Sequence, residues 1–122
     1  MDKTILVVDD EIDFLLAFKD QLTHMGYNVL TASSGAEAFD ILSTPGKDID
    51  LIIADVCMPE IDGKQILTTV KELVPETPII IITGYDVDTA EEFARKNEAN
   101  DFLVKPIQND KLKKSLDSCL KK

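Results

Sequence analysis

Short apolar segments alternate along the chain with longer segments that have helical spacing. Residues 5–8, 28–32, 51–54, 78–82 and 101–104 are rich in β-branched side chains and predict strands. After each strand, apolar residues recur every three or four positions, as they do on the buried face of a helix. These residues are Phe14, Phe18, Leu22 and Met25; Ala38, Phe39, Ile41 and Leu42; Ile66, Leu67, Val70 and Leu73; Ala90, Phe93 and Ala94; and Ile107, Leu112, Leu116 and Leu120.

This alternation predicts the α/β class, with five parallel strands covered by helices on both faces. The first, third and fourth strands are apolar throughout, which is typical of strands in the middle of a sheet. The second (NVLTA) and fifth (DFLV) are more mixed, as edge strands are. The pattern therefore favours a flavodoxin-like, three-layer (βα)5 sandwich with strand order 2-1-3-4-5.

Local signals mark the predicted helix ends. Ser34 with Glu37, and Asp88 with Glu91, have the spacing of an N-cap residue and its reciprocal acid. Gly26 suits the end of the first helix, because glycine tolerates a left-handed backbone.

Length and charge narrow the class of protein. The 122 residues suit one domain, predicted over residues 1–122, and 44% of them are apolar. The formal net charge of −10 disfavours direct binding to nucleic acid or to an anionic membrane. No apolar run approaches the roughly 20 residues that span a bilayer, and the N-terminus lacks the pattern of a signal peptide. We therefore expect a cytoplasmic protein.

The cysteines and the histidine exclude several kinds of site. Cys57 and Cys119 lie far apart in sequence and give neither a disulfide framework nor a zinc spacing. The single histidine, His24, is expected to have a structural role at the end of a helix.

Polar residues capable of phosphate chemistry follow four of the predicted strands. Asp9 and Asp10 end the first strand, Asp55 ends the third, Thr83 ends the fourth and Lys105 follows the fifth. In an open parallel sheet, ligands bind beyond the carboxyl ends of the strands, where the strand order reverses. We therefore expect these side chains to meet at one edge of the sheet.

Three carboxylates brought together repel one another unless a cation neutralises them. Mg²⁺ prefers oxygen ligands and is usually held by one or two carboxylates and a phosphate oxygen, so it is the expected cofactor, with Mn²⁺ as a substitute. Asp55 is the best candidate for a nucleophile, because a carboxylate can accept a phosphoryl group. Lys105 and Thr83 would supply a positive charge and a hydroxyl donor to the transferred oxygens.

With these residues in place, the chain resembles the receiver domain of two-component response regulators across its whole length. Residues 7–11 (VVDDE) resemble the acidic pocket of that family, and residues 55–63 (DVCMPEIDG) resemble its phosphoacceptor loop. Residues 82–85 (ITGY) match the switch threonine and the small residue after it. Residues 102–106 (FLVKP) match the switch aromatic and the lysine before proline.

The resemblance implies a role for each residue. Asp10 and Asp55 would coordinate Mg²⁺ directly, Asp9 would do so mainly through water, and the main-chain carbonyl of Cys57 would be a further ligand. The Lys105–Pro106 peptide would be cis. A sensor histidine kinase or a phosphotransfer protein would phosphorylate Asp55.

The resemblance also implies a response to phosphorylation. Thr83 would move toward the phosphoryl group and Phe102 would rotate inward. The face formed by the fourth helix, fifth strand and fifth helix would then bind a downstream output domain or protein, or a second copy of the chain.

Some residues keep two interpretations. The family's Gly-Ala before the fifth strand is Glu98-Ala99 here, and Asn97 is expected to take the left-handed conformation instead. Tyr85 either gates access to the site or only covers the loop. The Cys57 side chain is expected at the mouth of the pocket, where it would tune the lifetime of the acyl phosphate; a redox role is the alternative.

Other functions fit the sequence less well. A pure interaction module that has lost phosphorylation would usually lack one of the acidic, acceptor or lysine positions, and all are present. A phosphatase with an aspartate nucleophile would carry Asp-x-Asp near the first strand. A flavin carrier would have a phosphate loop rich in Ser, Thr and Gly after that strand.

Overall fold

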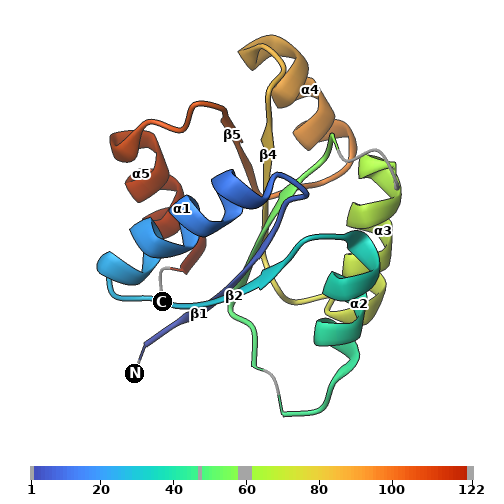
Figure 1. Ribbon diagram of the computed structural model, residues 1–122. Helices are drawn as coiled ribbons and strands as arrows, with labels where there is room; N and C mark the ends of the chain where they lie inside the picture. The colour runs from blue at the N-terminus through green and yellow to red at the C-terminus, as the bar shows by residue number, and fades with distance from the viewer. Residues whose placement is uncertain (1, 47, 58–61, 121–122) are drawn as a thin grey trace.

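The computed structural model describes residues 2–46, 48–57 and 62–120, which form a three-layer α/β fold (Figure 1). Strands and helices alternate strictly along the chain. The elements are β1 (Thr4–Val8), α1 (Ile12–His24), β2 (Asn28–Ala32), α2 (Gly35–Ser43), β3 (Leu51–Asp55), α3 (Gly63–Leu73), β4 (Ile79–Thr83), α4 (Val87–Lys96), β5 (Asp101–Val104) and α5 (Asn109–Leu120). Within the described residues, no helix has the length and apolar character that crossing a membrane requires.

The strands form one parallel sheet in the order β2-β1-β3-β4-β5, which confirms the predicted order. Every residue of β3 and β4 is buried, whereas β2 and β5 at the edges are only partly buried. The composition of each strand thus follows its place in the sheet, because a central strand is covered on both faces.

Two apolar cores lie on the two faces of the sheet. Helices α1 and α5 cover one face, and α2, α3 and α4 cover the other (Figure 1). Successive side chains of a strand point to opposite faces, so Ile5 and Val7 of β1 enter the first core, while Leu6 and Val8 enter the second.

The strand register brings the predicted site residues to one edge. Val8 pairs with Ala54, so Asp9 and Asp55 follow paired positions on the neighbouring strands β1 and β3. On the other side of β3, Asp55 pairs with Ile82 of β4, next to Thr83. Thr83 in turn pairs with Val104 of β5, and the Lys105 N–H donates to the Thr83 carbonyl over 2.8 Å.

The helix ends confirm some of the predicted signals and correct others. Ser34 caps α2 by accepting from the Glu37 N–H, as expected, but the Glu37 carboxylate accepts from the Ser33 N–H. Gly26 after α1 has a φ of 101°. The prediction that Asp88 caps α4 is wrong: Asp86 does so, accepting from the Thr89 N–H over 2.8 Å.

The left-handed residue after α4 is also not the expected one. Asn97 has a φ of −105°, and Glu98 has a φ of 60°. The Asn97 side chain donates to the Phe93 carbonyl instead, which ties it to the last turn. Ala99 N–H donates to Ala94 and Glu98 N–H to Arg95, a Schellman pattern that places the left-handed turn at Glu98.

Gly63 lets α3 begin close to the end of β3. A Cβ atom at this position would lie 2.6 Å from the Val56 Cβ and 2.7 Å from the Val56 carbonyl oxygen. No side chain fits at such distances without a backbone shift, so glycine is required for the close approach. Because Val56 follows Asp55 directly, this contact helps to fix the chain next to the site.

Candidate functional site

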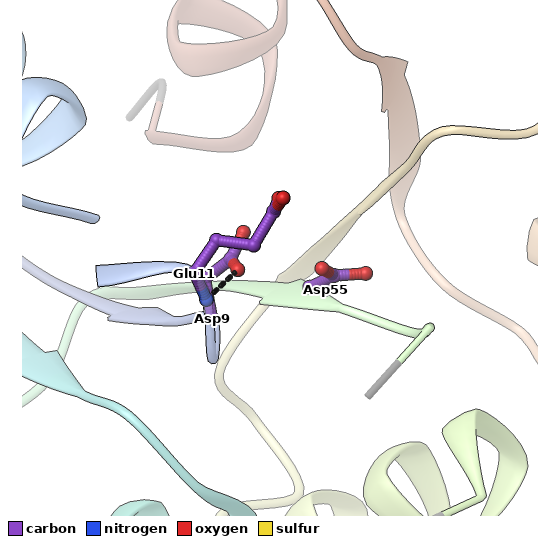
Figure 2. Close-up of side chains that lie close together, drawn as sticks. All are labelled: Asp9, Glu11 and Asp55. Carbon is purple, nitrogen blue, oxygen red and sulfur yellow. Dashed lines mark hydrogen bonds between the residues drawn. The ribbon is translucent and has the colours of Figure 1, made fainter. Parts of the chain in front are cut away.

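Three carboxylates converge at the carboxyl edge of β1 and β3. Asp9, Glu11 and Asp55 each place a carboxylate oxygen within 4.8 Å of the others (Figure 2). Asp9 is fully buried, Asp55 is buried and Glu11 lies at the exposed rim. The Glu11 N–H donates to Asp9 Oδ1 over 2.8 Å, which fixes the loop between β1 and α1.

Lys105 supplies a cation to all three carboxylates. Its Nζ lies 2.6 Å from Glu11 Oε1, 2.8 Å from Asp9 Oδ2 and 3.2 Å from Asp55 Oδ2. It also lies 4.3 Å from the centre of the Phe14 ring, a cation–π contact. Burial alone would lower the pKa of Lys105, but the close contacts with the carboxylates of Asp9 and Glu11 and the charge of Asp55 raise it well above its usual range. Lys105 is therefore charged at any physiological pH.

One oxygen of the site lacks a hydrogen bond. Asp9 Oδ2 is buried and has no hydrogen-bond partner within the described residues, since its 2.8 Å contact with Lys105 Nζ is ionic without hydrogen-bond geometry. A buried carboxylate oxygen is costly unless a donor or a cation satisfies it. The arrangement of oxygen donors therefore fits a hard divalent cation such as Mg²⁺.

Two contacts orient the Asp55 carboxylate at the end of β3. Its Oδ1 accepts from the Cys57 N–H over 2.8 Å, and its Oδ2 faces Lys105. Burial raises the pKa of the Asp55 carboxyl, and the charge of Asp9 adds to the rise. The Cys57 N–H and Lys105 act in the opposite direction. One oxygen is thus fixed by the backbone, while the other faces the shared cation.

Thr83 lies next to Asp55 at the end of β4 and is fully buried. Its Oγ1 accepts from the Tyr85 N–H over 3.1 Å and lies 3.2 Å from the Cys57 Sγ. The Cys57 thiol, which is exposed, therefore contacts the threonine hydroxyl at the mouth of the site. Tyr85 is half exposed beside it, and the Cys57 thiol raises the pKa of the Tyr85 hydroxyl.

Phe102 lies away from this cluster on β5. It is partly buried against the core beneath α4, and it lines a cavity of about 760 Å³ between β5, α4 and α5. Asp101 beside it accepts from Ser115 Oγ of α5 over 2.5 Å. Phe102 therefore has open space next to it in this structure.

Comparison with known proteins agrees with this geometry. A model of the response regulator receiver domain matches residues 5–117 of the chain. The chain belongs to this family. The solved receiver domain protein from Clostridium thermocellum is 36% identical to it with a TM-score of 0.87, covering 97% of this chain and 94% of that one.

A second solved relative of this receiver domain is the response regulator protein TrrA from Thermotoga maritima in complex with Mg²⁺-BeF. That chain is 31% identical with a TM-score of 0.82, and the match covers 97% of this chain and 99% of that one.

Longer proteins also contain a segment similar to this receiver domain. The transcriptional regulatory protein ZraR of Escherichia coli O157:H7 is 40% identical over 117 residues, which are 95% of this chain and 26% of ZraR. The sensor kinase CckA of Brucella abortus is 34% identical over 122 residues, which are 98% of this chain and 13% of CckA. The chain thus spans about a quarter or less of these relatives.

The receiver domain brings together most of the side chains that the sequence singled out. Asp9, Asp55 and Lys105 meet directly, and Thr83 reaches them through Cys57. The Lys105–Pro106 peptide is cis, as expected. Asp10 lies outside the group of three carboxylates, so its role as a metal ligand stays a prediction, as does that of the Cys57 carbonyl.

The contact of Glu11 with Lys105 was not predicted from the sequence. In the sequence, Glu11 is only the last member of the acidic segment, and an acid at the start of a helix is usually explained by its interaction with the helix dipole. Residues 58–61 of the predicted phosphoacceptor loop lie outside the described residues.

Proposed function

We propose that this receiver domain accepts a phosphoryl group on Asp55 in a reaction that depends on Mg²⁺. A sensor histidine kinase or a phosphotransfer protein would donate the group, and small phosphodonors would do so more slowly. The observation that carries the proposal is the contact between Asp55 and Lys105 inside a group of three carboxylates. Such a site joins a nucleophile to the charges that phosphoryl transfer requires.

Each residue of the site has one part in the transfer. Asp55 Oδ2 forms the new oxygen–phosphorus bond, while the bond between phosphorus and the donor nitrogen breaks and its electron pair stays with the donor. The Cys57 N–H holds the other oxygen of Asp55 so that the nucleophile is oriented. Lys105 moves its hydrogen bonds to the transferred oxygens, and Thr83 donates its hydroxyl to one of them.

The metal would be held by Asp9, Asp55, Asp10 and the main-chain carbonyl of Cys57. When bound, Mg²⁺ offsets the negative charge shared by the carboxylates and the incoming phosphoryl group. Asp9 Oδ2 supports this assignment, because it is buried, accepts no hydrogen bond from the described residues and lies beside a second carboxylate, as suits a ligand of a hard cation.

The response would pass from Thr83 to Phe102. Thr83 leaves its contact with Cys57 when it binds the phosphoryl group, and Phe102 turns inward. The face of α4, β5 and α5 then favours binding to an output domain, a separate protein or a second copy of the chain. The cavity beside Phe102 supports this step, because it leaves space next to the ring. These events would take place in the cytoplasm.

Intact-mass analysis after incubation with acetyl phosphate and Mg²⁺ tests the proposal. The parent protein should gain the mass of one phosphoryl group, and Asp55→Asn should gain none. Asp88→Asn, which changes an exposed aspartate of α4, is the matched control and should label like the parent. Equal labelling of Asp55→Asn and the parent would refute the assignment. A parent that never labels would favour an interaction module that works without phosphorylation.

A further inference from the structure

Lys105 occupies the space between two of the carboxylates that would hold the metal. Its Nζ contacts Asp9 Oδ2 and Asp55 Oδ2 at the ends of the paired strands β1 and β3. Both carboxylates are buried, so Lys105 is the internal cation that neutralises them in this structure. Any cation that binds the carboxylates of Asp9 and Asp55 must compete with Lys105 for their negative charge.

Glu11 is the one of the three carboxylate partners of Lys105 that the proposed metal site does not use as a ligand. Its contact with Lys105 is the shortest of the three at 2.6 Å, and its side chain is 64% exposed at the outer rim. Lys105 itself is only 17% exposed. A charge so little exposed is costly without a partner. Lys105 therefore needs a carboxylate partner that remains paired with it when Asp9 and Asp55 bind a metal.

The local sequence is consistent with this use of Glu11. Glu11 is the N-cap residue of α1, yet its side chain makes no cap hydrogen bond. Glutamate is not among the residues preferred at an N-cap, where Ser, Thr, Asp and Asn lead. A position that breaks a local preference without a local gain is expected to serve a functional site. Here the carboxylate is turned toward Lys105 rather than toward the helix.

We propose that Glu11 is a positioning residue that retains Lys105 when Asp9 and Asp55 bind a divalent cation. The Glu11–Lys105 pair persists while Lys105 gives up Asp9, so the lysine remains charged, paired and close to the acceptor carboxylate. Phe14 beneath the ammonium group helps to hold it on the α1 side. The inference rests on the proposed metal site, and it assigns to Glu11 a role separate from metal ligation.

A simpler effect of Glu11 must be separated from this one. Any acid near the site adds negative potential and favours Mg²⁺, whether or not it contacts Lys105. Asp13 provides the matched control, because it lies in the first turn of the same helix, is exposed and makes no ion pair in the described part of the chain. Glu11→Asp keeps the charge but shortens the side chain, so it separates charge from reach.

Calorimetric titration of the whole chain with MgCl₂, without any phosphodonor, tests the inference. Glu11→Gln should weaken Mg²⁺ binding about five- to tenfold, the size of one charge-assisted hydrogen bond. Asp13→Asn should change it less than about twofold, since an exposed charge is screened by salt. Glu11→Asp should resemble Glu11→Gln rather than the parent.

The same titration in a Lys105→Met background completes a double-mutant cycle. There, Glu11→Gln should change Mg²⁺ binding no more than Asp13→Asn does, because the lysine that Glu11 retains is gone. An equal effect of Glu11→Gln with and without Lys105 would overturn the inference. If Lys105→Met does not fold, tighter Mg²⁺ binding by Glu11→Gln, or parental binding by Glu11→Asp, would overturn it alone. A parent that binds no Mg²⁺ would overturn the proposed metal site as well.

Discussion

The two ends of the proposed signalling path are built differently. Asp9, Asp55 and Thr83 lie on or directly after strands β1, β3 and β4, whose side chains are almost all buried. Phe102 lies on the edge strand β5, in which Leu103 is the only buried residue. The acidic site is thus held by two packed cores, whereas the face around Phe102 borders an open cavity.

This difference indicates where the molecule is rigid and where it can change. Phosphoryl transfer requires charged groups that lie within a few tenths of an ångström of their productive positions. Central strands provide that precision. A surface that responds needs two packings of similar free energy. The half-buried strand β5 borders a cavity and so has space for a second one. Predictions about the two regions should therefore differ in kind: changes at the acidic site should alter charge balance, and changes near Phe102 should alter packing.

Lys105→Met should have the largest effect on the acidic site. It leaves Asp9, Glu11 and Asp55 without their cation, so the metal-free protein should lose about 2 to 3 kcal/mol of unfolding free energy, as when one partner of a buried ion pair is removed. Mg²⁺ should restore more stability to this variant than to the parent. Urea unfolding with EDTA and with MgCl₂ measures both.

Lys64→Met, which removes an exposed lysine of α3, is the control for that experiment. It should change stability little, because an isolated surface charge contributes little. Equal loss of stability in the two variants would mean that the acidic site does not depend on Lys105, and the contrast between the two regions would fail.

The pH dependence of stability should reveal the cost of burying Asp55. Because burial raises its pKa, the folded state binds this proton more tightly than the unfolded state. The contribution of this carboxyl to the unfolding free energy is fully present below the ordinary pKa of aspartate. It is lost as the pH rises through the raised pKa of the folded state. In metal-free buffer at neutral pH, Asp55→Asn should therefore be more stable than the parent, and the difference should vanish in acid. A parent that is the more stable protein at neutral pH would contradict this.

The sequence predicts the rigid region well for a physical reason. Strands covered on both faces need apolar residues at every position, so β1, β3 and β4 can be read directly from their composition. The polar residue that ends such a strand is equally visible, which is why Asp9, Asp55 and Thr83 could be placed at one edge. The fold, the strand order and the meeting of Asp9 and Asp55 with Lys105 followed from this pattern.

The sequence predicts less where several local solutions compete. Asp86 and Asp88 both suit an N-cap, and only the backbone of the loop before α4 selects Asp86. Asn97 and Glu98 both precede Ala99, and the bond from the Asn97 side chain to Phe93 leaves the left-handed turn to Glu98. The contact of Glu11 with Lys105 joins residues far apart in sequence, and no periodicity encodes it.

Ser115→Ala should have a moderate effect that is confined to the responsive region. It removes the donor to Asp101, whose oxygen is then partly buried without that partner, so unfolding free energy should fall by about 1 to 2 kcal/mol. Phosphoryl uptake from acetyl phosphate should be unchanged, since Ser115 does not contact the acidic site. Ser118→Ala, at an exposed position lining the same cavity, should leave both quantities unchanged. Slower uptake by Ser115→Ala would show that the two regions are not separable in this way.

The smallest effect should come from the cap of α4, which forms one wall of the responsive region. Asp86→Ala removes the bond to the Thr89 N–H and should cost about 1 kcal/mol, whereas Asp88→Ala should cost only a few tenths, because Asp88 caps nothing and acts through the helix dipole. Thermal unfolding of both variants, with hydrogen exchange of the α4 amides, measures the difference. Loss of protection limited to α4 in Asp86→Ala would show that this helix opens independently of the acidic site. Equal costs for the two variants would mean that the cap does not hold the helix start, and global loss of protection would mean that the molecule responds as one unit.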